Sequence, residues 1–334
     1  MSKSKSLGCF IAFRNTTCKS ANSSSRDLAV SIANRQNSQQ QSEQRITFDL
    51  TRFDVTNAEG FSFNSINAAN FFMATVTDQD PYQIIEDPYR MGTNFNGFDQ
   101  RARIVKHPSI EKRSALKIEF PKGEYGTLET GVNAKIPLKI ESDRVYLEYS
   151  FSFLGLEGDS DSLPQMGKLL GLCIAECTTG KKPSDGTNGA STRISYRSYR
   201  DDKMALFGYI YHLGQKNDYG TYIPAPYRKA KEALENLSVI GEADSNYPTI
   251  KLGEDQINDV RMIVSLNTPG KANGEVEIYL NNRLLSHAKK LMFRESADEK
   301  FSGLAFDIFH GGGADARIPV NASILLYEIT VAPH

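Results

Sequence analysis

The stretch Val145-Tyr146-Leu147-Glu148-Tyr149-Ser150-Phe151 places Val, Leu, Tyr and Phe at every second position, with more polar residues between them. Successive side chains of a β-strand point to opposite faces, so this period of two predicts a strand with one face in a core. The same alternation recurs along the chain at residues 46–50, 115–120, 260–264, 276–280 and 324–329. Turn sequences such as Pro121-Lys122-Gly123 separate these segments. Many short strands with regular turns predict an all-β sandwich or jelly roll of two antiparallel sheets.

The bulk composition is that of a globular protein that does not enter a membrane. The 334 residues carry a formal net charge of −1, and no apolar run approaches the ~20 residues that a membrane-spanning helix needs. The short apolar stretch Leu7–Phe13 stops at Arg14 and lacks a convincing cleavage site, so it is a poor signal peptide. We expect no membrane partner.

The charges divide the chain into unequal parts. Residues 1–45 hold seven basic and two acidic side chains and are rich in Ser, Asn and Gln, which predicts a flexible arm that docks on an assembly partner. The remainder carries 32 basic and 38 acidic residues, so any polyanion must be held by cations gathered locally, and nucleic acid is not expected. We therefore divide the chain into the arm, a segment 46–95 of uncertain role, and a jelly roll over 96–334.

One segment departs from the β pattern. Apolar residues recur at helical spacing between Pro226 and Gly241, at Tyr227, Ala230, Leu234 and Leu237. This spacing predicts a single helix inserted between strands. Its basic residues Arg228, Lys229 and Lys231 either face a ligand or, as we favour, form an ordinary solvated surface.

The cysteines and histidines give no sign of a metal site. Cys173 and Cys177 lie four residues apart and either bridge within one loop or, as we favour, remain two unconnected core residues. None of the five histidines occurs at a metal-ligand spacing, and no phosphate-binding loop, G-x-S-x-G or H-E-x-x-H motif is present. We expect no metal and no cofactor.

The residues suited to chemistry lie between Lys168 and His212. In a strand over residues 191–199, the face that holds Ser191, Arg193, Ser195, Arg197 and Tyr199 carries only hydroxyls and guanidiniums. Tyr209 and Tyr211 share a face of the next strand, and His212 should point away from them. Taken alone, such tyrosines are usually packing partners, and Lys168 at a strand edge usually blocks aggregation.

Five short motifs in order resemble polysaccharide lyase family 14, the alginate and glucuronan lyases. They are Gly167-Lys168-Leu169-Leu170-Gly171-Leu172 for the family's G-K-L-P-G-L, Ser191-x-Arg193, Tyr209-x-Tyr211, Leu266-Asn267-Thr268-Pro269-Gly270 with Asn273-Gly274, and Phe309-His310-Gly311-Gly312 for F-F-G-G. This chain has Leu170 where the family has Pro, and it has no Trp. The resemblance implies a jelly roll with a concave substrate groove.

The resemblance also implies cleavage of a uronate-containing acidic polysaccharide by β-elimination. Arg193 would neutralise the carboxylate with Lys168 and Ser191 beside it, and Ser195 and Arg197 would bind substrate. Tyr211 would act as base and acid, and Tyr209 would either orient the sugar or share that role, provided that Lys168 and Arg193 lower the tyrosine pKa.

Two alternatives remain open beside the lyase. One is a glycan-binding module without catalysis, which the missing Trp and Leu170 favour. The other is a structural or virion-surface protein whose arm enters an assembly. Since some members of the resembled family are virus-encoded, we expect an extracellular or virion-associated protein. A glycosidase with paired carboxylates is not excluded by the residues alone.

Overall fold

The computed structural model describes residues 45–51, 61–62, 72, 75–76, 95–107, 114–156, 166–199 and 203–334, except 227, 242 and 245. Residues 1–44 lie outside this range, so the predicted arm has no structural counterpart here. Among the described helices, none is both long enough and apolar enough to cross a membrane.

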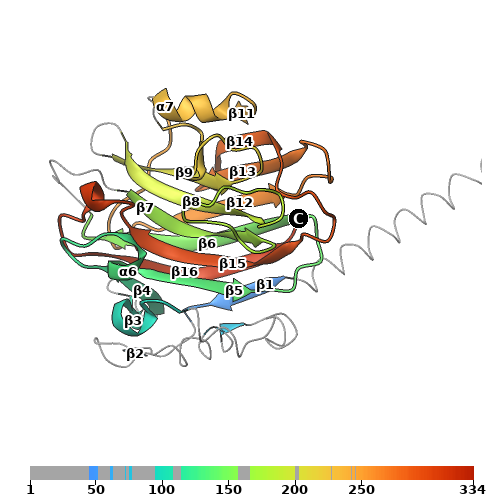
Figure 1. Cartoon of the computed structure of the whole chain (residues 1–334). Helices are drawn as coiled ribbons and strands as arrows, with labels where there is room; N and C mark the ends of the chain where they lie inside the picture. The colour runs from blue at the N-terminus through green and yellow to red at the C-terminus, as the bar shows by residue number, and fades with distance from the viewer. Residues whose placement is uncertain are drawn as a thin grey trace, which may run out of the picture. The chain divides into compact units, whose positions relative to one another are not determined.

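Ten strands form the larger antiparallel sheet (Figure 1). In spatial order they are β11 (Ser238–Ile240), β14 (Arg283–Leu291), β13 (Gly274–Leu280), β12 (Asn258–Ser265), β6 (Arg144–Leu154), β16 (Ala322–Pro333), β4 (Ser114–Phe120), β3 (Ala102–Lys106) and β2 (Phe61–Ser62), with β1 (Ile46–Asp49) also paired to β16. All six alternating segments of the sequence lie in this sheet, as β1, β4, β6, β12, β13 and β16. The predicted strands are therefore confirmed.

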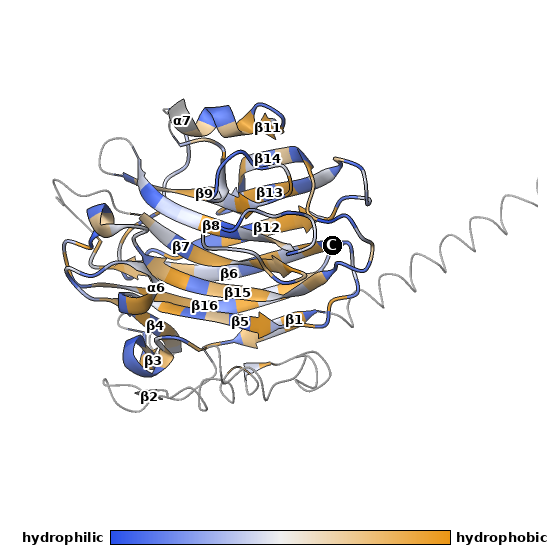
Figure 2. Ribbon diagram, viewed as in Figure 1, coloured by the Kyte–Doolittle hydropathy of each residue, from blue (hydrophilic) through white to orange (hydrophobic). Residues whose placement is uncertain are grey.

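A second antiparallel sheet has six strands. Its order is β10 (Thr221–Ile223), β9 (Lys203–Tyr211), β8 (Ala190–Tyr199), β7 (Met166–Ile174), β15 (Phe301–His310) and β5 (Val132–Pro137). Figure 2 shows both hydrophilic and hydrophobic residues along the strands, and buried and half-buried residues alternate along β13 of the larger sheet and β5 of the smaller one. The two sheets confirm the predicted all-β sandwich.

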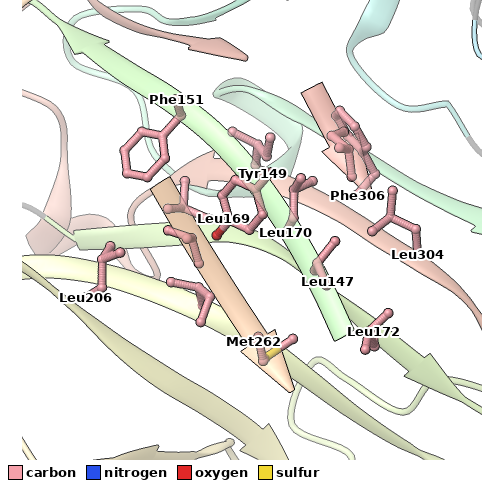
Figure 3. Packing of buried hydrophobic residues seen from close by; sticks show 14 of the residues in the cluster. Leu147, Tyr149, Phe151, Leu169, Leu170, Leu172, Leu206, Met262, Leu304 and Phe306 are labelled. Atoms are coloured by element: carbon pink, nitrogen blue, oxygen red, sulfur yellow. The ribbon is translucent and has the colours of Figure 1, made fainter. Parts of the chain in front are cut away.

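The core lies between the two sheets. Leu147 and Met262 of the larger sheet pack with Leu172 and Leu206 of the smaller one (Figure 3). The rings of Phe153 on β6 and Tyr196 on β8 lie 4.9 Å apart. Leu170, which replaces the family's proline, is completely buried in this cluster. The substitution is therefore accommodated as an ordinary core residue.

The described parts of the segment 46–95 belong to this core. Ile46 of β1 pairs with Val331 of β16, which places β1 in the larger sheet. The buried ring of Phe72 lies 6.0 Å from Phe48 and 5.0 Å from Phe306 on β15. This segment, whose role was uncertain from the sequence, thus contributes the strands β1 and β2 and core side chains.

The inserted helix is shorter than predicted. It comprises α7 (Arg228–Lys231) and a 3-10 turn, η1 (Glu232–Leu234), after which the chain enters β11. Ala230 is buried, and Leu234 and Leu237 are half-buried against the core, so these members of the expected apolar face pack inward. The side chains of Arg228 and Lys229 lie outside the described residues. Among the described residues, α5 (Phe98–Arg101), α6 (Gly126–Glu129) and η2 (Ala314–Ala316) are further short helical turns.

Cys173 and Cys177 form a disulfide, so the preference for two unconnected cysteines is wrong. β7 ends at Ile174, and the chain then turns sharply through positive φ angles of 48° at Ala175 and 65° at Cys177. This turn brings the two cysteine Cα atoms to 4.6 Å, within bridging range. A sequence separation of four does not reveal such a turn.

Candidate active site

Neighbouring strands bring the predicted residues together on the outer face of the smaller sheet. Arg193 of β8 stands opposite Tyr209 of β9, and Ser191 stands opposite Tyr211. Ile194 and Tyr196 point the other way, into the core. The predicted pairing of these two strands and the predicted division of their faces are both confirmed.

Lys168 lies in the same cluster. Its Nζ donates to Ser195 Oγ at 3.2 Å and lies 3.6 Å from the centre of the Tyr209 ring. Burial, with the charges of Arg197 and Arg193 adding to it, lowers the pKa of Lys168 to about 7. A substantial share of this amine is therefore neutral at neutral pH and able to accept a proton.

The two tyrosines form an edge-to-face pair with ring centres 5.8 Å apart. The backbone N–H of Lys181 donates to the Tyr211 hydroxyl at 3.3 Å. Burial is the main cause that raises the pKa of Tyr209, and the neighbouring Tyr211 and Tyr222 raise it further. The expectation that Lys168 and Arg193 lower the tyrosine pKa is therefore wrong for Tyr209, because burial disfavours the phenolate and the only opposing contribution comes from a backbone hydrogen bond with Gly220.

Arg193 is held at two of its nitrogens. Its Nε donates to Asp307 Oδ2 at 2.5 Å, and its Nη1 donates to Ser191 Oγ at 2.7 Å. The third nitrogen, Nη2, lies 4.0 Å from the disulfide sulfur of Cys177. One edge of the guanidinium thus meets only a weak acceptor among the described residues, and a carboxylate would be a far stronger partner.

Asp307, Asn133 and Tyr222 were missed by the sequence analysis. Asn133 of β5 donates through Nδ2 to Asp307 Oδ1 and stands opposite Asp307 in the strand pairing. Tyr222 of β10 packs its ring 5.0 Å from that of Tyr209. An acidic residue between the core residues Phe306 and Ile308 was the available signal for Asp307, but its partner was not visible.

The cluster is nearly closed to solvent. Exposed fractions are 8% for Lys168, 4% for Arg193 and 2% for Tyr211. Part of this cover is the segment after β7, where the carbonyl of Thr178 accepts a hydrogen bond from Ser191 at 2.7 Å. Arg197 and Tyr209 are half-buried and are thus more exposed than Lys168, Arg193 and Tyr211.

Ser195, Arg197 and His212 take part in contacts other than those of the catalytic candidates described above. Ser195 accepts from Lys168 and donates to the Gly167 carbonyl at 2.8 Å, so it positions the lysine. Arg197 lies with its guanidinium carbon 5.5 Å from the centre of the Tyr222 ring. His212 bonds to Thr221 at 3.0 Å, outside the cluster, and burial lowers its pKa to about 4.

One group of side chains on the larger sheet has a metal-ligand spacing within the described residues. Glu275, Glu277 and His287 place one potential ligand atom each within 4.8 Å of one another. Glu275 is paired with His287 at 2.7 Å, and Glu277 accepts from Arg144 at 3.1 Å. Each of the three side chains thus has a partner among the described residues.

The chain is similar to one protein family and to several solved structures. The model of the family described as Polysaccharide lyase 14 matches residues 108–318. No curated protein sequence matches the chain.

Several solved structures share the fold. Alginate lyase Aly36B in complex with alginate trisaccharide is 18% identical with a TM-score of 0.62, over 87% of this chain and 98% of that one. The alginate lyase of Aplysia kurodai is 20% identical with a TM-score of 0.50, over 72% and 89%. Alginate lyase vAL-1 from Chlorella virus is 14% identical with a TM-score of 0.51, over 75% and 98%.

Proposed function

Because this chain belongs to the polysaccharide lyase 14 family, we propose that its buried cationic cluster cleaves a polyuronate of the alginate or glucuronan type by β-elimination. Membership makes the protein a polysaccharide lyase acting on an acidic glycan, and the uronate and the residue roles are the proposal. The observation that supports it best is the convergence of Lys168, Arg193, Tyr209 and Tyr211 from three adjacent strands.

The first requirement of the reaction is to neutralise the uronate carboxylate. Removal of the C5 proton places negative charge on the carboxyl group, and fixed positive charge stabilises this enolate-like state. We assign this task to Arg193, whose Nη2 edge meets, among the residues that the structure describes, only the Cys177 sulfur at 4.0 Å. Ser191 supports the guanidinium by accepting from Nη1 at 2.7 Å, and Arg197, which is half-buried, is the more exposed of the two arginines.

The second requirement is a base and an acid. As the C5–H bond breaks, its electron pair forms the C4=C5 double bond, the C4–O4 bond breaks, and the leaving oxygen takes a proton. A neutral Lys168 amine, with a pKa lowered to about 7, is suited to accept the C5 proton. Tyr211 then donates to O4, and Tyr209, whose raised pKa keeps it a neutral phenol, orients the sugar.

Absorbance of the new C4=C5 double bond tests this proposal. The protein is incubated with polymannuronate, polyguluronate and polyglucuronate, and the ultraviolet absorbance is followed. We expect a rise on at least one polymer, and a loss of about 100-fold or more with Tyr211→Phe. Tyr247→Phe is the matched control, because it removes a buried hydroxyl that donates to the Leu206 carbonyl outside the cluster. No rise on any polymer would refute the proposal.

We also propose that the protein works in an extracellular or virion-associated setting. The Cys173–Cys177 disulfide supports this, because disulfides persist mainly in oxidising compartments. Residues 1–45 would bind an assembly partner. Deleting residues 1–44 should abolish association with that assembly while leaving polyuronate cleavage in solution unchanged. Unchanged association would contradict the role of the arm.

A further inference from the structure

We infer that Asp307, supported by Asn133, is a positioning residue that fixes which edge of the Arg193 guanidinium meets the substrate carboxylate. This inference rests on the proposed role of Arg193. Asp307 lies on β15 and Arg193 on β8, with β7 between them. The aspartate therefore acts on the arginine from two strands away.

The path between the two residues is open because β7 has a glycine at this point. Gly171 stands opposite Arg193 in the strand pairing. A Cβ atom at residue 171 would lie 2.8 Å from Arg193 Cγ and 2.0 Å from the Thr192 carbonyl oxygen. Only a residue without a side chain lets the arginine cross β7 and reach Asp307.

Asp307 is itself held in place. Its Oδ1 accepts from Asn133, and its Oδ2 accepts from Arg193 Nε at 2.5 Å, so each oxygen serves one partner. Asn133 is anchored by two backbone hydrogen bonds with Asn96, of 2.9 and 3.0 Å. The aspartate side chain is only 9% exposed, so solvent does little to weaken these contacts.

This arrangement determines how Arg193 can be used. Asp307 occupies Nε and Ser191 occupies Nη1, which leaves the Nη2 edge toward Cys177. A guanidinium pinned on one side cannot rotate when a carboxylate arrives, so little orientation is lost as charge develops in the transition state. An aspartate that only balanced a buried charge would give no such effect on turnover.

A double-mutant cycle separates these two roles. Asp307→Asn keeps the shape of the side chain and removes its charge. We expect kcat to fall by roughly 10- to 100-fold, as is typical for groups that orient a functional side chain, with a smaller change in KM. In an Arg193→Lys background, which lacks the fork that Asp307 orients, the same substitution should change kcat by less than about threefold.

Asp143→Asn is the matched control, because Asp143 also pairs with a buried arginine, Arg294, at 2.9 Å. It should lower the unfolding midpoint and leave kcat unchanged. Equal losses for Asp307→Asn in both backgrounds, or no loss in either, would overturn the inference. If Asp307→Asn does not fold, Asn133→Ala replaces it in the cycle, with an expected loss of about 3- to 10-fold that again disappears with Arg193→Lys.

The outcome also distinguishes this inference from the proposed function. If the unaltered protein binds oligouronates in calorimetry without cleaving them, the lyase proposal fails, and the cycle is measured on dissociation constants instead. Coupling between the two residues then still supports the inference. If the unaltered protein cleaves the polymer and the kcat losses of the two substitutions are additive, only the inference about Asp307 is refuted. If the unaltered protein neither cleaves nor binds any uronate, both the lyase proposal and the inference are refuted.

Discussion

Arg193 and Arg294 are both buried, but the protein satisfies the hydrogen bonds of their guanidinium groups in different ways. Their side chains are 4% and 3% exposed, and each pairs with one aspartate. A buried charge is costly unless its hydrogen bonds are satisfied. The difference between the two lies in how completely the protein satisfies them.

Arg294 has an oxygen acceptor at each of its three nitrogens. Nη1 and Nη2 bind the two oxygens of Asp143 at 3.0 and 2.9 Å, Nε binds the Asn267 carbonyl at 2.9 Å, and Nη1 also binds the Glu299 carbonyl at 3.1 Å. Arg193 has oxygen acceptors at Nε and Nη1 and a sulfur at Nη2. A guanidinium with an oxygen acceptor at every nitrogen serves to join segments of the fold, whereas one whose Nη2 meets only a sulfur among the described residues is suited to bind an anion.

Replacing each of the two arginines by alanine tests this comparison directly and includes the largest effect that we expect. Arg193→Ala should lower kcat by about 10³-fold, the scale for removing a group that stabilises developing charge. Arg294→Ala should leave kcat of the folded enzyme unchanged and lower the free energy of unfolding by about 2–3 kcal/mol, because it orphans the Asn267 and Glu299 carbonyls. Absorbance kinetics and thermal unfolding of both variants check this. A lost kcat in Arg294→Ala would mean that the two arginines do not differ in role.

The disulfide beside Arg193 gives the next largest effect. Cys173→Ser with Cys177→Ser opens a loop closed over a sequence separation of four, which should cost about 2 kcal/mol of unfolding free energy. The double substitution should also lower kcat. The turn that the disulfide closes leads to Thr178, which contacts Ser191, and to Lys181, which contacts Tyr211. Denaturant unfolding and kinetics, each with and without a reductant on the unaltered protein, measure both effects. Full activity after reduction would show that the loop does not shape the site.

The pH dependence of kcat/KM tests the role of Lys168, which lies in the same cluster as Arg193. Since the pKa of Lys168 is lowered to about 7, the neutral amine predominates above that pH. We expect kcat/KM to fall about tenfold per pH unit below 7 and to level off above it. Lys168→Arg, which stays protonated, should be inactive. Highest activity below pH 7 would instead assign the charged lysine to the carboxylate and the base to Tyr211.

The smallest effect comes from an ion pair that is neither buried nor functional. Lys216 and Glu235 pair with exposed fractions of 42% and 63%. Lys216→Ala should change the free energy of unfolding by no more than about 1 kcal/mol and leave kcat unaffected. Thermal unfolding at low and high salt checks this, and a larger loss would show that exposure alone does not rank these pairs.

Much of the fold was predictable because it depends on local pattern. The alternation in Val145–Phe151 places one face in the core whatever its neighbours are. Arg193, Tyr209 and Lys168 were identified by residue type and motif order. Asp307 and the disulfide were not predicted, because each depends on a contact that the chain makes only after folding. Burial also reversed the expected pKa shift of Tyr209, and the burial of a face cannot be deduced from its composition.

The pairing of β1 with β16 bears on how the protein can be shortened. A chain shortened to begin at residue 108, where the family match begins, but kept through residue 334 would lose β1, which covers residues 328–331 of β16. Those backbone N–H and C=O groups would then form an open sheet edge able to recruit a strand from another molecule. We expect such a shortened protein to aggregate during purification even though every residue of the catalytic cluster is retained.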